Sequence, residues 1–225
     1  MSAPLVVAID GPAGTGKSTI ARRLAGTLGI PYLDTGAMYR ALGLRVLESG
    51  VDPADATAVA EVAEAAEVRL RPEAGGGIAV LLDGEPLGER IRRPAVGEVT
   101  SQIARIPAVR AKLVALQREL ARQHGGVIEG RDIGTKVVPE TPHKFFLDAR
   151  PEVRFARRFA ELREGGQTVT LGDVAREMSE RDRRDAGRAD SPLSCDASYT
   201  VVDTSDLSVE QVIERMMAAI RSKAS

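Results

Sequence analysis

The stretch LVVAIDGPAGTGKST, residues 5–19, decides the fold of this chain. Its apolar half, Leu5–Ile9, is short enough for a buried strand, and three glycines follow it. Apolar residues then repeat at helical spacing: Ile20, Leu24 and Leu28. The stretch therefore predicts a strand, a glycine-rich turn and a helix over Lys17–Leu28.

The turn matches the phosphate-binding (Walker A) pattern in full, from the glycine at 11 to the serine at 18. Its glycines let backbone N–H groups point inward, and the helix N-terminus adds positive potential. A plain glycine turn is the alternative, but the helical repeat behind the turn favours a nucleotide site. Lys17 is expected to reach the outer phosphates and Ser18 to ligate Mg²⁺. The predicted nucleotide-binding residues are Gly11, Pro12, Ala13, Gly14, Thr15, Gly16, Lys17, Ser18 and Thr19.

The composition bounds the class of protein. The chain has 225 residues and a formal net charge of −1, which gives no argument for electrostatic capture of nucleic acid. No stretch approaches the length of a membrane span, and the first strand begins almost at the N-terminus. Cys195 is the only cysteine, so we expect a buried or inert thiol. These features favour a soluble cytoplasmic enzyme acting on small molecules, with no nucleic acid or membrane partner. We expect a monomer, although these features do not decide the oligomeric state.

Strands and helices alternate along the rest of the chain. Two capping boxes, Thr170–Asp173 and Ser208–Gln211, open the last two helices. Short extended pieces around the Asp83-Gly84 turn indicate a small antiparallel insertion at about Val68–Leu87. Five short strands alternating with helices predict an α/β fold with a five-stranded parallel sheet covered on both faces. Those strands are expected at 5–9, 30–33, 127–129, 144–147 and 199–202.

Polar stretches follow two of these strands, at the edge where parallel sheets bind ligands. In Asp34–Arg40, Arg40 is either a solvated charge or a phosphate ligand, because a guanidinium fork matches phosphate oxygens. Glu129–Thr135 reads EGRDIGT and is either a salt-bridged turn or a polar-ligand site. Two carboxylates around an arginine at this edge favour the ligand.

An arginine-rich segment, Arg181–Arg188, lies downstream of the Gly165-Gly166 break, and Arg154, Arg157 and Arg158 precede that break. A solvated helix face with internal ion pairs is one interpretation. The other is a mobile set of arginines over the phosphate loop, which phosphoryl transfer requires because charge spreads over the transferred group in the transition state.

The motifs DGPAGTGKST, DTGAMYR, EGRDIGT and RDRRDAGRADSPL together resemble the bacterial cytidylate kinase family, in order and spacing, over nearly the whole chain. The resemblance implies phosphorylation of CMP and dCMP by ATP with Mg²⁺, and an adenylate-kinase-like P-loop fold. It also implies a core at about 1–36, 105–150 and 190–225, a monophosphate-binding part at about 37–104 and a helical lid at about 151–189. Lys136 departs from the apolar residue that the family pattern leads us to expect.

The same resemblance implies roles for individual side chains. Ser101, Arg110 and Asp132 would hold the cytosine, and Asp185 would contact the pentose. The implied catalytic residues are Lys17, Arg131, Arg158 and Arg188. The implied substrate-binding residues are Thr35, Arg40, Ser101, Arg110, Glu129, Arg131, Asp132, Arg181, Asp185 and Arg188.

Two rival functions stay open at this point. One is another small-molecule P-loop kinase, acting on UMP, AMP or a non-nucleotide. The other is a nucleotide-dependent switch that hydrolyses slowly. The chain contains no asparagine, so it lacks the Asn-Lys-x-Asp motif with which GTPases read guanine, and this argues against the switch.

Overall fold

The computed structural model describes residues 4–73, 77–187 and 193–223. Within them, five strands form one sheet in the order β2-β6-β1-β7-β8. Strand β1 pairs in parallel with β7, and β7 pairs in parallel with β8. The five-stranded parallel α/β fold predicted from the sequence is therefore confirmed. The strands are β1 (Val6–Asp10), β2 (Tyr32–Asp34), β6 (Gly126–Glu129), β7 (His143–Asp148) and β8 (Thr200–Asp203).

The inner strands are buried because their side chains are apolar on both faces. Val7, Ala8 and Ile9 of β1 are fully buried, and so are Val127 and Ile128 of β6. A parallel sheet covered by helices requires such continuous apolar runs. At their carboxyl ends the strands β1 and β6 finish in polar residues, Asp10 and Glu129, which lie at the candidate site described below.

A second sheet is small and antiparallel, in the order β3-β4-β5. Its strands are β3 (Val68–Pro72), β4 (Ile78–Leu82) and β5 (Glu85–Pro86). Asp83 and Gly84 turn the chain between β4 and β5 with φ of 51° and 84°, the left-handed values of a tight hairpin turn. The predicted antiparallel insertion is therefore confirmed.

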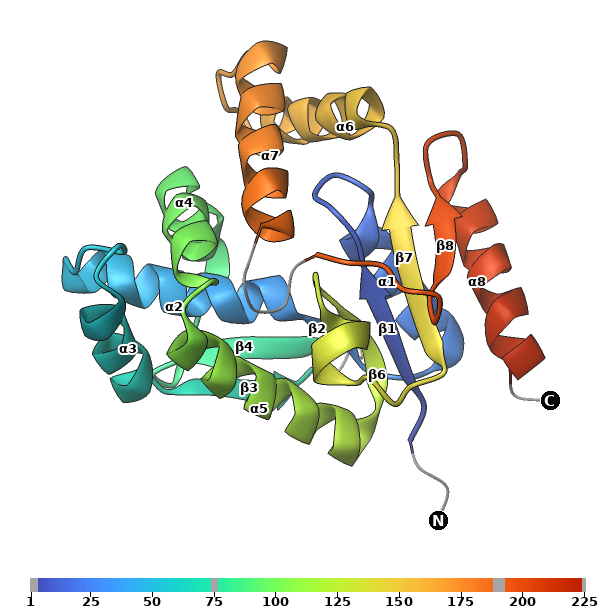
Figure 1. Ribbon diagram of the computed structural model, residues 1–225, viewed down its shortest axis with the longest axis horizontal. Helices are drawn as coiled ribbons and strands as arrows, with labels where there is room; N and C mark the ends of the chain where they lie inside the picture. The colour runs from blue at the N-terminus through green and yellow to red at the C-terminus, as the bar shows by residue number, and fades with distance from the viewer. Residues whose placement is uncertain (1–3, 74–76, 188–192, 224–225) are drawn as a thin grey trace. The chain divides into compact units, whose positions relative to one another are not determined.

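The chain divides into two compact units, which are described separately. The first comprises Met1–Val6 and Ala25–Ile128. Its helices are α2 (Thr35–Ser49), α3 (Ala56–Ala65), α4 (Pro94–Ile103) and α5 (Pro107–His124). A short 3₁₀ helix, η1 (Gly88–Arg92), precedes α4. The long helix α2 packs against α3, α4, α5 and strand β4, so it is the centre of this unit (Figure 1).

The second unit comprises Val7–Leu24 and Glu129–Ser225. It holds most of helix α1 (Lys17–Leu28) and the helices α6 (Pro151–Glu164), α7 (Leu171–Ala186) and α8 (Val209–Lys223). Helix α7 packs against α6, and α8 packs against β7 (Figure 1). Both predicted capping boxes are present. Thr170 Oγ1 accepts from the Asp173 N–H, and Ser208 Oγ accepts from the Gln211 N–H while Gln211 Oε1 accepts from the Ser208 N–H.

Some local features differ from the sequence expectations. A π-helical turn, η2 (Ile133–Val137), follows β6 where only a polar loop was predicted. Lys136 is an exposed residue of this turn, which explains why a charged side chain is tolerated there. Cys195 is exposed rather than buried, and partial desolvation and neighbouring carboxylates raise the pKa of its thiol, which leaves it a poor nucleophile.

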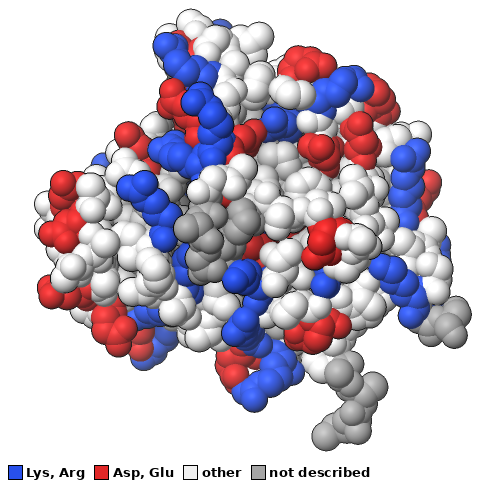
Figure 2. Space-filling model, in the orientation of Figure 1, with Lys and Arg blue, Asp and Glu red and all other residues white. Residues whose placement is uncertain are grey.

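The surface carries both signs of charge, and Figure 2 shows basic and acidic side chains interspersed over the visible face. This pattern agrees with the formal net charge of −1. Among the described residues, no helix is both long and apolar enough to cross a membrane.

Candidate active site

The phosphate-binding loop lies between β1 and α1, as the sequence predicts. Gly11 and Gly14 have φ of 146° and 79°, a region that side chains with a Cβ rarely adopt. There is also no room for a side chain at either position. A Cβ at Gly11 would lie 2.0 Å from the Leu147 carbonyl oxygen, and one at Gly14 would lie 2.8 Å from the Arg154 carbonyl oxygen. The backbone path of this loop therefore depends on glycine at both positions.

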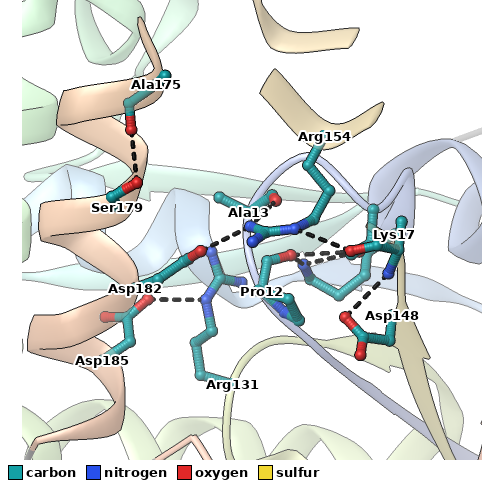
Figure 3. A network of polar contacts seen from close by, with 12 residues as sticks. Pro12, Ala13, Lys17, Arg131, Asp148, Arg154, Ala175, Ser179, Asp182 and Asp185 are labelled. Carbon is teal, nitrogen blue, oxygen red and sulfur yellow. Dashed lines mark hydrogen bonds and ion pairs between the residues drawn. The ribbon is translucent and has the colours of Figure 1, made fainter. Parts of the chain in front are cut away.

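Lys17 is held by the loop that it follows. Its Nζ donates to the Pro12 carbonyl oxygen at 2.6 Å and lies 3.5 Å from Thr15 Oγ1, and the side chain is almost fully buried (Figure 3). Burial lowers the pKa of Lys17 well below its usual value and the Arg131 guanidinium lowers it further, while the Glu129 and Asp10 carboxylates oppose both effects. An anion at the loop would supply the missing counter-charge and favour the ammonium form.

Arg131 extends from the loop after β6 toward α7. Its Nε donates to Asp185 Oδ2 at 3.0 Å and its Nη1 donates to the Gly130 carbonyl oxygen at 3.1 Å (Figure 3). Asp185 is buried on α7, and Arg181, one turn earlier, is close enough to lower the pKa of Lys17. The structure thus brings five of the predicted site residues together: Lys17, Glu129, Arg131, Arg181 and Asp185.

Arg154 of α6 also reaches this loop, although the sequence assigned it only generally to the lid. Its Nη1 donates to the Ala13 carbonyl oxygen at 3.1 Å and to Asp182 Oδ2 at 2.6 Å (Figure 3). Arg158, one turn further along α6, is more exposed and pairs with Glu161 at 2.9 Å. An ion pair between two helices has no periodic signal in a sequence, which explains why the pairing of Arg154 with Asp182 was not predicted.

Thr204, which follows β8, also contacts the phosphate-binding loop. Thr204 Oγ1 donates to the Thr15 carbonyl oxygen at 3.0 Å. Arg157 of α6 donates to both Thr204 Oγ1 and the Thr204 carbonyl oxygen, at 3.1 and 2.7 Å. Helix α6 is therefore linked to the loop, by way of Thr204, through polar contacts that the sequence did not predict.

Asp132, buried beside Arg131, belongs to the second unit, whereas Thr35, Arg40, Ser101 and Arg110 lie on three helices of the first. Asp34 caps α2 by accepting from the Ala37 N–H at 3.0 Å, and its other oxygen accepts from Arg40 Nη2 at 2.8 Å. Arg110 of α5 is buried and donates through Nη1 to the Tyr39 hydroxyl at 3.2 Å. Thr35, the first residue of α2, is also buried.

Ser101 lies on α4 of the first unit. Its Oγ is buried and makes no hydrogen bond within the described part of the chain. A buried hydroxyl without a partner costs free energy, so it fits a position where a ligand completes the hydrogen bonding. Arg188, the remaining predicted residue, lies outside the described residues.

Comparison with known proteins agrees with this arrangement. The family model described as cytidylate kinase matches residues 7–222. The chain belongs to the cytidylate kinase family. The resemblance inferred from the motifs is therefore confirmed, and the match includes both the phosphate-binding loop and the arginine-rich helix α7.

Relatives within the cytidylate kinase family cover almost the full chain. A cytidylate kinase of Pelotomaculum thermopropionicum is 47% identical over 95% of this chain and 95% of its own length. One of Mycobacterium avium is 45% identical over 100% of this chain and 98% of its own. Among solved structures, an uncharacterised protein of Eubacterium ventriosum shares the fold, with a TM-score of 0.54 at 14% identity over 97% of this chain and 99% of that one.

Proposed function

We propose that this chain transfers the γ-phosphoryl group of ATP to CMP and dCMP, giving ADP with CDP or dCDP. The observation that carries the proposal is the glycine loop folded around the Lys17 ammonium, in a chain of the cytidylate kinase family. The reaction breaks the bond between the γ-phosphorus and the β,γ-bridging oxygen. It forms a bond from that phosphorus to a phosphate oxygen of the acceptor, without a covalent enzyme intermediate.

Residues Gly11–Thr19 bind the triphosphate. When the triphosphate binds, Lys17 donates to its phosphate oxygens in place of the Pro12 carbonyl. The phosphate oxygens bear more negative charge, so they offset the cost of burying the ammonium group. The Ser18 hydroxyl is exposed at the start of α1 and fits a Mg²⁺ ligand, because Mg²⁺ prefers oxygen donors and otherwise keeps water and phosphate oxygens. The ion would neutralise phosphate charge.

The acceptor is held by a separate set of side chains. Arg40, Arg131, Arg181 and Arg188 contact its phosphate or the transferring group, and Thr35 and Glu129 complete the substrate-binding set. Ser101, Arg110 and Asp132 hold the cytosine, and Asp185 contacts the pentose. The buried Ser101 Oγ and the buried Arg110 support these roles, because buried polar groups are expected to have hydrogen-bonding partners.

The chemistry requires little beyond positioning and neutralising charge. The acceptor phosphate is already ionised, so no general base is needed. This agrees with the positions of the two histidines, since His124 ends α5 and His143 begins β7, away from the carboxyl edge of the sheet. Arg131, Arg158 and Arg188 join Lys17 in stabilising the charge that spreads over the transferred group.

We also propose the division of labour that the family resemblance implies. The core is at about 1–36, 105–150 and 190–225, the monophosphate-binding part at about 37–104 and the lid at about 151–189. Closure of the lid would exclude water, which otherwise competes as phosphoryl acceptor. The enzyme acts as a cytoplasmic monomer.

A coupled assay of ADP release tests the proposal, with ATP and either CMP, dCMP, UMP, AMP or no acceptor. We expect CMP and dCMP to give the highest kcat/KM, with little ATP turnover in their absence. A better rate with UMP, AMP or a non-nucleotide acceptor would assign the chain to another kinase specificity. ATP hydrolysis that is indifferent to CMP would instead support a nucleotide-dependent switch.

A further inference from the structure

Asp10, the last residue of β1, is a buried charge that the proposed reaction does not use. It is fully buried, and its carboxylate accepts three hydrogen bonds. The donors are the Ile133 N–H at 2.8 Å, the Gly134 N–H at 2.9 Å and the Tyr199 hydroxyl at 2.7 Å. A buried carboxylate is costly unless such donors surround it, so its retention calls for an explanation.

Two of the donors belong to the π-helical turn η2, which follows directly on Arg131 and Asp132. The turn closes on itself, because the Lys136 N–H donates to the Asp132 carbonyl oxygen at 2.9 Å and the Val138 N–H donates to the Ile133 carbonyl oxygen at 2.8 Å. Its first N–H groups have their acceptor in Asp10 rather than within the turn. Asp10 therefore fixes the start of the turn that directly follows Arg131 and Asp132.

Tyr199 holds the other side of the Asp10 carboxylate. Its ring packs edge-on against Phe146 with centroids 6.2 Å apart, which aims the hydroxyl at Asp10 Oδ2. A Cβ at Gly134 would lie 2.6 Å from that hydroxyl, so the turn and the tyrosine are in close contact.

A purely structural role would leave these contacts to stabilise the fold, as many buried networks do. Two features point further. Two of the proposed substrate-binding residues, Arg131 and Asp132, directly precede the turn, and Asp10 is followed at once by Gly11 of the phosphate-binding loop. The same carboxylate thus joins the backbone beside the nucleotide loop to the backbone beside the acceptor residues.

We propose that Tyr199 and Asp10 are positioning residues of this kinase, which set the backbone of residues 131–134 and so the placement of Asp132 against the acceptor base. The inference rests on the proposed function, because it assigns the consequence of that placement to cytosine selection. Tyr199 acts through Asp10 and touches no substrate itself.

The test replaces Tyr199 by phenylalanine, which keeps the ring against Phe146 and removes only the hydroxyl. We expect kcat/KM for CMP to fall about three- to tenfold, which is less than the full worth of a hydrogen bond to a charged group because Tyr199 acts on Asp132 only indirectly. The value for UMP and the KM for ATP should change less than about twofold, so the CMP-to-UMP ratio falls. The Asp132→Ala, Tyr199→Phe double variant should show no further fall in that ratio than Asp132→Ala alone.

Ser208→Ala is the matched control, because it removes a hydroxyl that caps α8 in the same unit. It should lower the thermal midpoint without changing the CMP-to-UMP ratio. If Tyr199→Phe also lowers only the midpoint and leaves the ratio intact, the positioning role is overturned. An equal loss for CMP and UMP would overturn it as well.

A second measurement needs no substrate. Amide hydrogen exchange by NMR should be faster at Ile133 and Gly134 in Tyr199→Phe than in wild type, with the remainder of the sheet unchanged. Unchanged exchange at both amides would show that Tyr199 does not position the turn. The absence of CMP preference in the wild-type enzyme would refute the proposed function instead, and the exchange data would still decide whether the turn is held as described.

Discussion

The phosphate loop and the helices proposed to hold the acceptor are built from different kinds of contact. Around Gly11–Lys17 the contacts are largely to backbone: Lys17 donates to a carbonyl, Arg154 donates to another, and Thr204 donates to a third. The proposed acceptor residues on α2 and α5 instead contact other side chains: Arg110 bonds to the Tyr39 hydroxyl and Arg40 to the Asp34 carboxylate. A backbone-built site reads charge and shape, whereas a site built of side chains can read hydrogen-bonding pattern.

The difference has a consequence for substitutions. Changes near the loop should affect any substrate, because they alter how phosphate charge is neutralised. Changes among the acceptor side chains should affect CMP and UMP differently, because they alter which base edge finds a partner. Four predictions test this division, from the largest expected effect to the smallest.

Lys17→Ala should lower kcat at least about a hundredfold while the protein stays folded. The Lys17 ammonium stabilises the negative charge that shifts between phosphate groups in the transition state. Losing such a contact raises the activation free energy by about 3 kcal/mol or more. Lys112→Ala is the matched control. Lys112 also donates to backbone carbonyls, those of Glu64 and Ala66 at 2.9 and 2.7 Å, but at the end of α3. Lys112→Ala should lower the stability of the protein and leave kcat near the wild-type value. If Lys17→Ala keeps a tenth of the wild-type activity, Lys17 does not have the proposed role in phosphoryl transfer.

The phosphate loop could be predicted from the sequence because its geometry is encoded within a contiguous stretch. The pattern from Gly11 to Ser18 requires particular backbone torsions, and the apolar repeat of α1 supplies the context. The Arg154–Asp182 pair and the Asp10–Tyr199 bond could not be predicted in this way. Their partners are 28 and 189 residues apart, and only tertiary packing decides that they meet.

The acceptor residues illustrate the same limit in a different form. Ser101 and Arg110 have no local pattern that marks them, and only the family resemblance led to them. The π-helical turn η2 was also missed, because its wide turn depends on the buried Asp10 carboxylate accepting from Ile133 and Gly134. A helical or strand period in the sequence carries no information about such a contact.

Asp132→Ala should lower the CMP-to-UMP ratio of kcat/KM by about tenfold or more, chiefly through loss of CMP activity. Cytosine presents an amino donor to the carboxylate, whereas uracil presents an oxygen, so two acceptors would face each other. A buried polar group without a partner costs about 1–3 kcal/mol, and more if it is charged. Steady-state kinetics with both nucleotides measure the ratio. Equal wild-type values, or a variant that keeps the full ratio, would refute this role for Asp132.

Tyr39→Phe tests the acceptor helices with a smaller change. The Tyr39 hydroxyl accepts from Arg110 Nη1 at 3.2 Å, so the substitution removes one of the contacts that hold the guanidinium. We expect the KM for CMP to rise about two- to tenfold with kcat and the KM for ATP little changed, which matches the loss of one neutral hydrogen-bonding partner. Ser49→Ala, which removes a hydroxyl bonded to the Val46 carbonyl on the same helix, is the control. If kcat instead falls equally with every acceptor nucleotide, Tyr39 acts on phosphoryl transfer in general and not on binding of the acceptor base.

The smallest effect concerns the strand beneath the phosphate loop. His143 begins β7, whose far end at Leu147 contacts Gly11, and its Nδ1 is buried without a hydrogen-bond partner in the described part of the chain. Burial lowers the pKa of His143, and the Lys223 ammonium lowers it further. The unfolded chain therefore binds a proton at this position more readily than the folded chain.

Stability consequently falls as the pH drops below about 6.5, the usual pKa of an unfolded histidine. In His143→Gln the free energy of unfolding should fall less between about pH 7.5 and about pH 5.5 than in wild type, because the glutamine takes up no proton. Urea unfolding at both pH values measures the difference, and the carboxylates common to both proteins cancel in the comparison. His124→Gln, which replaces the exposed histidine at the end of α5, should keep the wild-type dependence. If His143→Gln keeps it as well, the buried ring contributes nothing to the acid sensitivity of the unit that carries the phosphate loop.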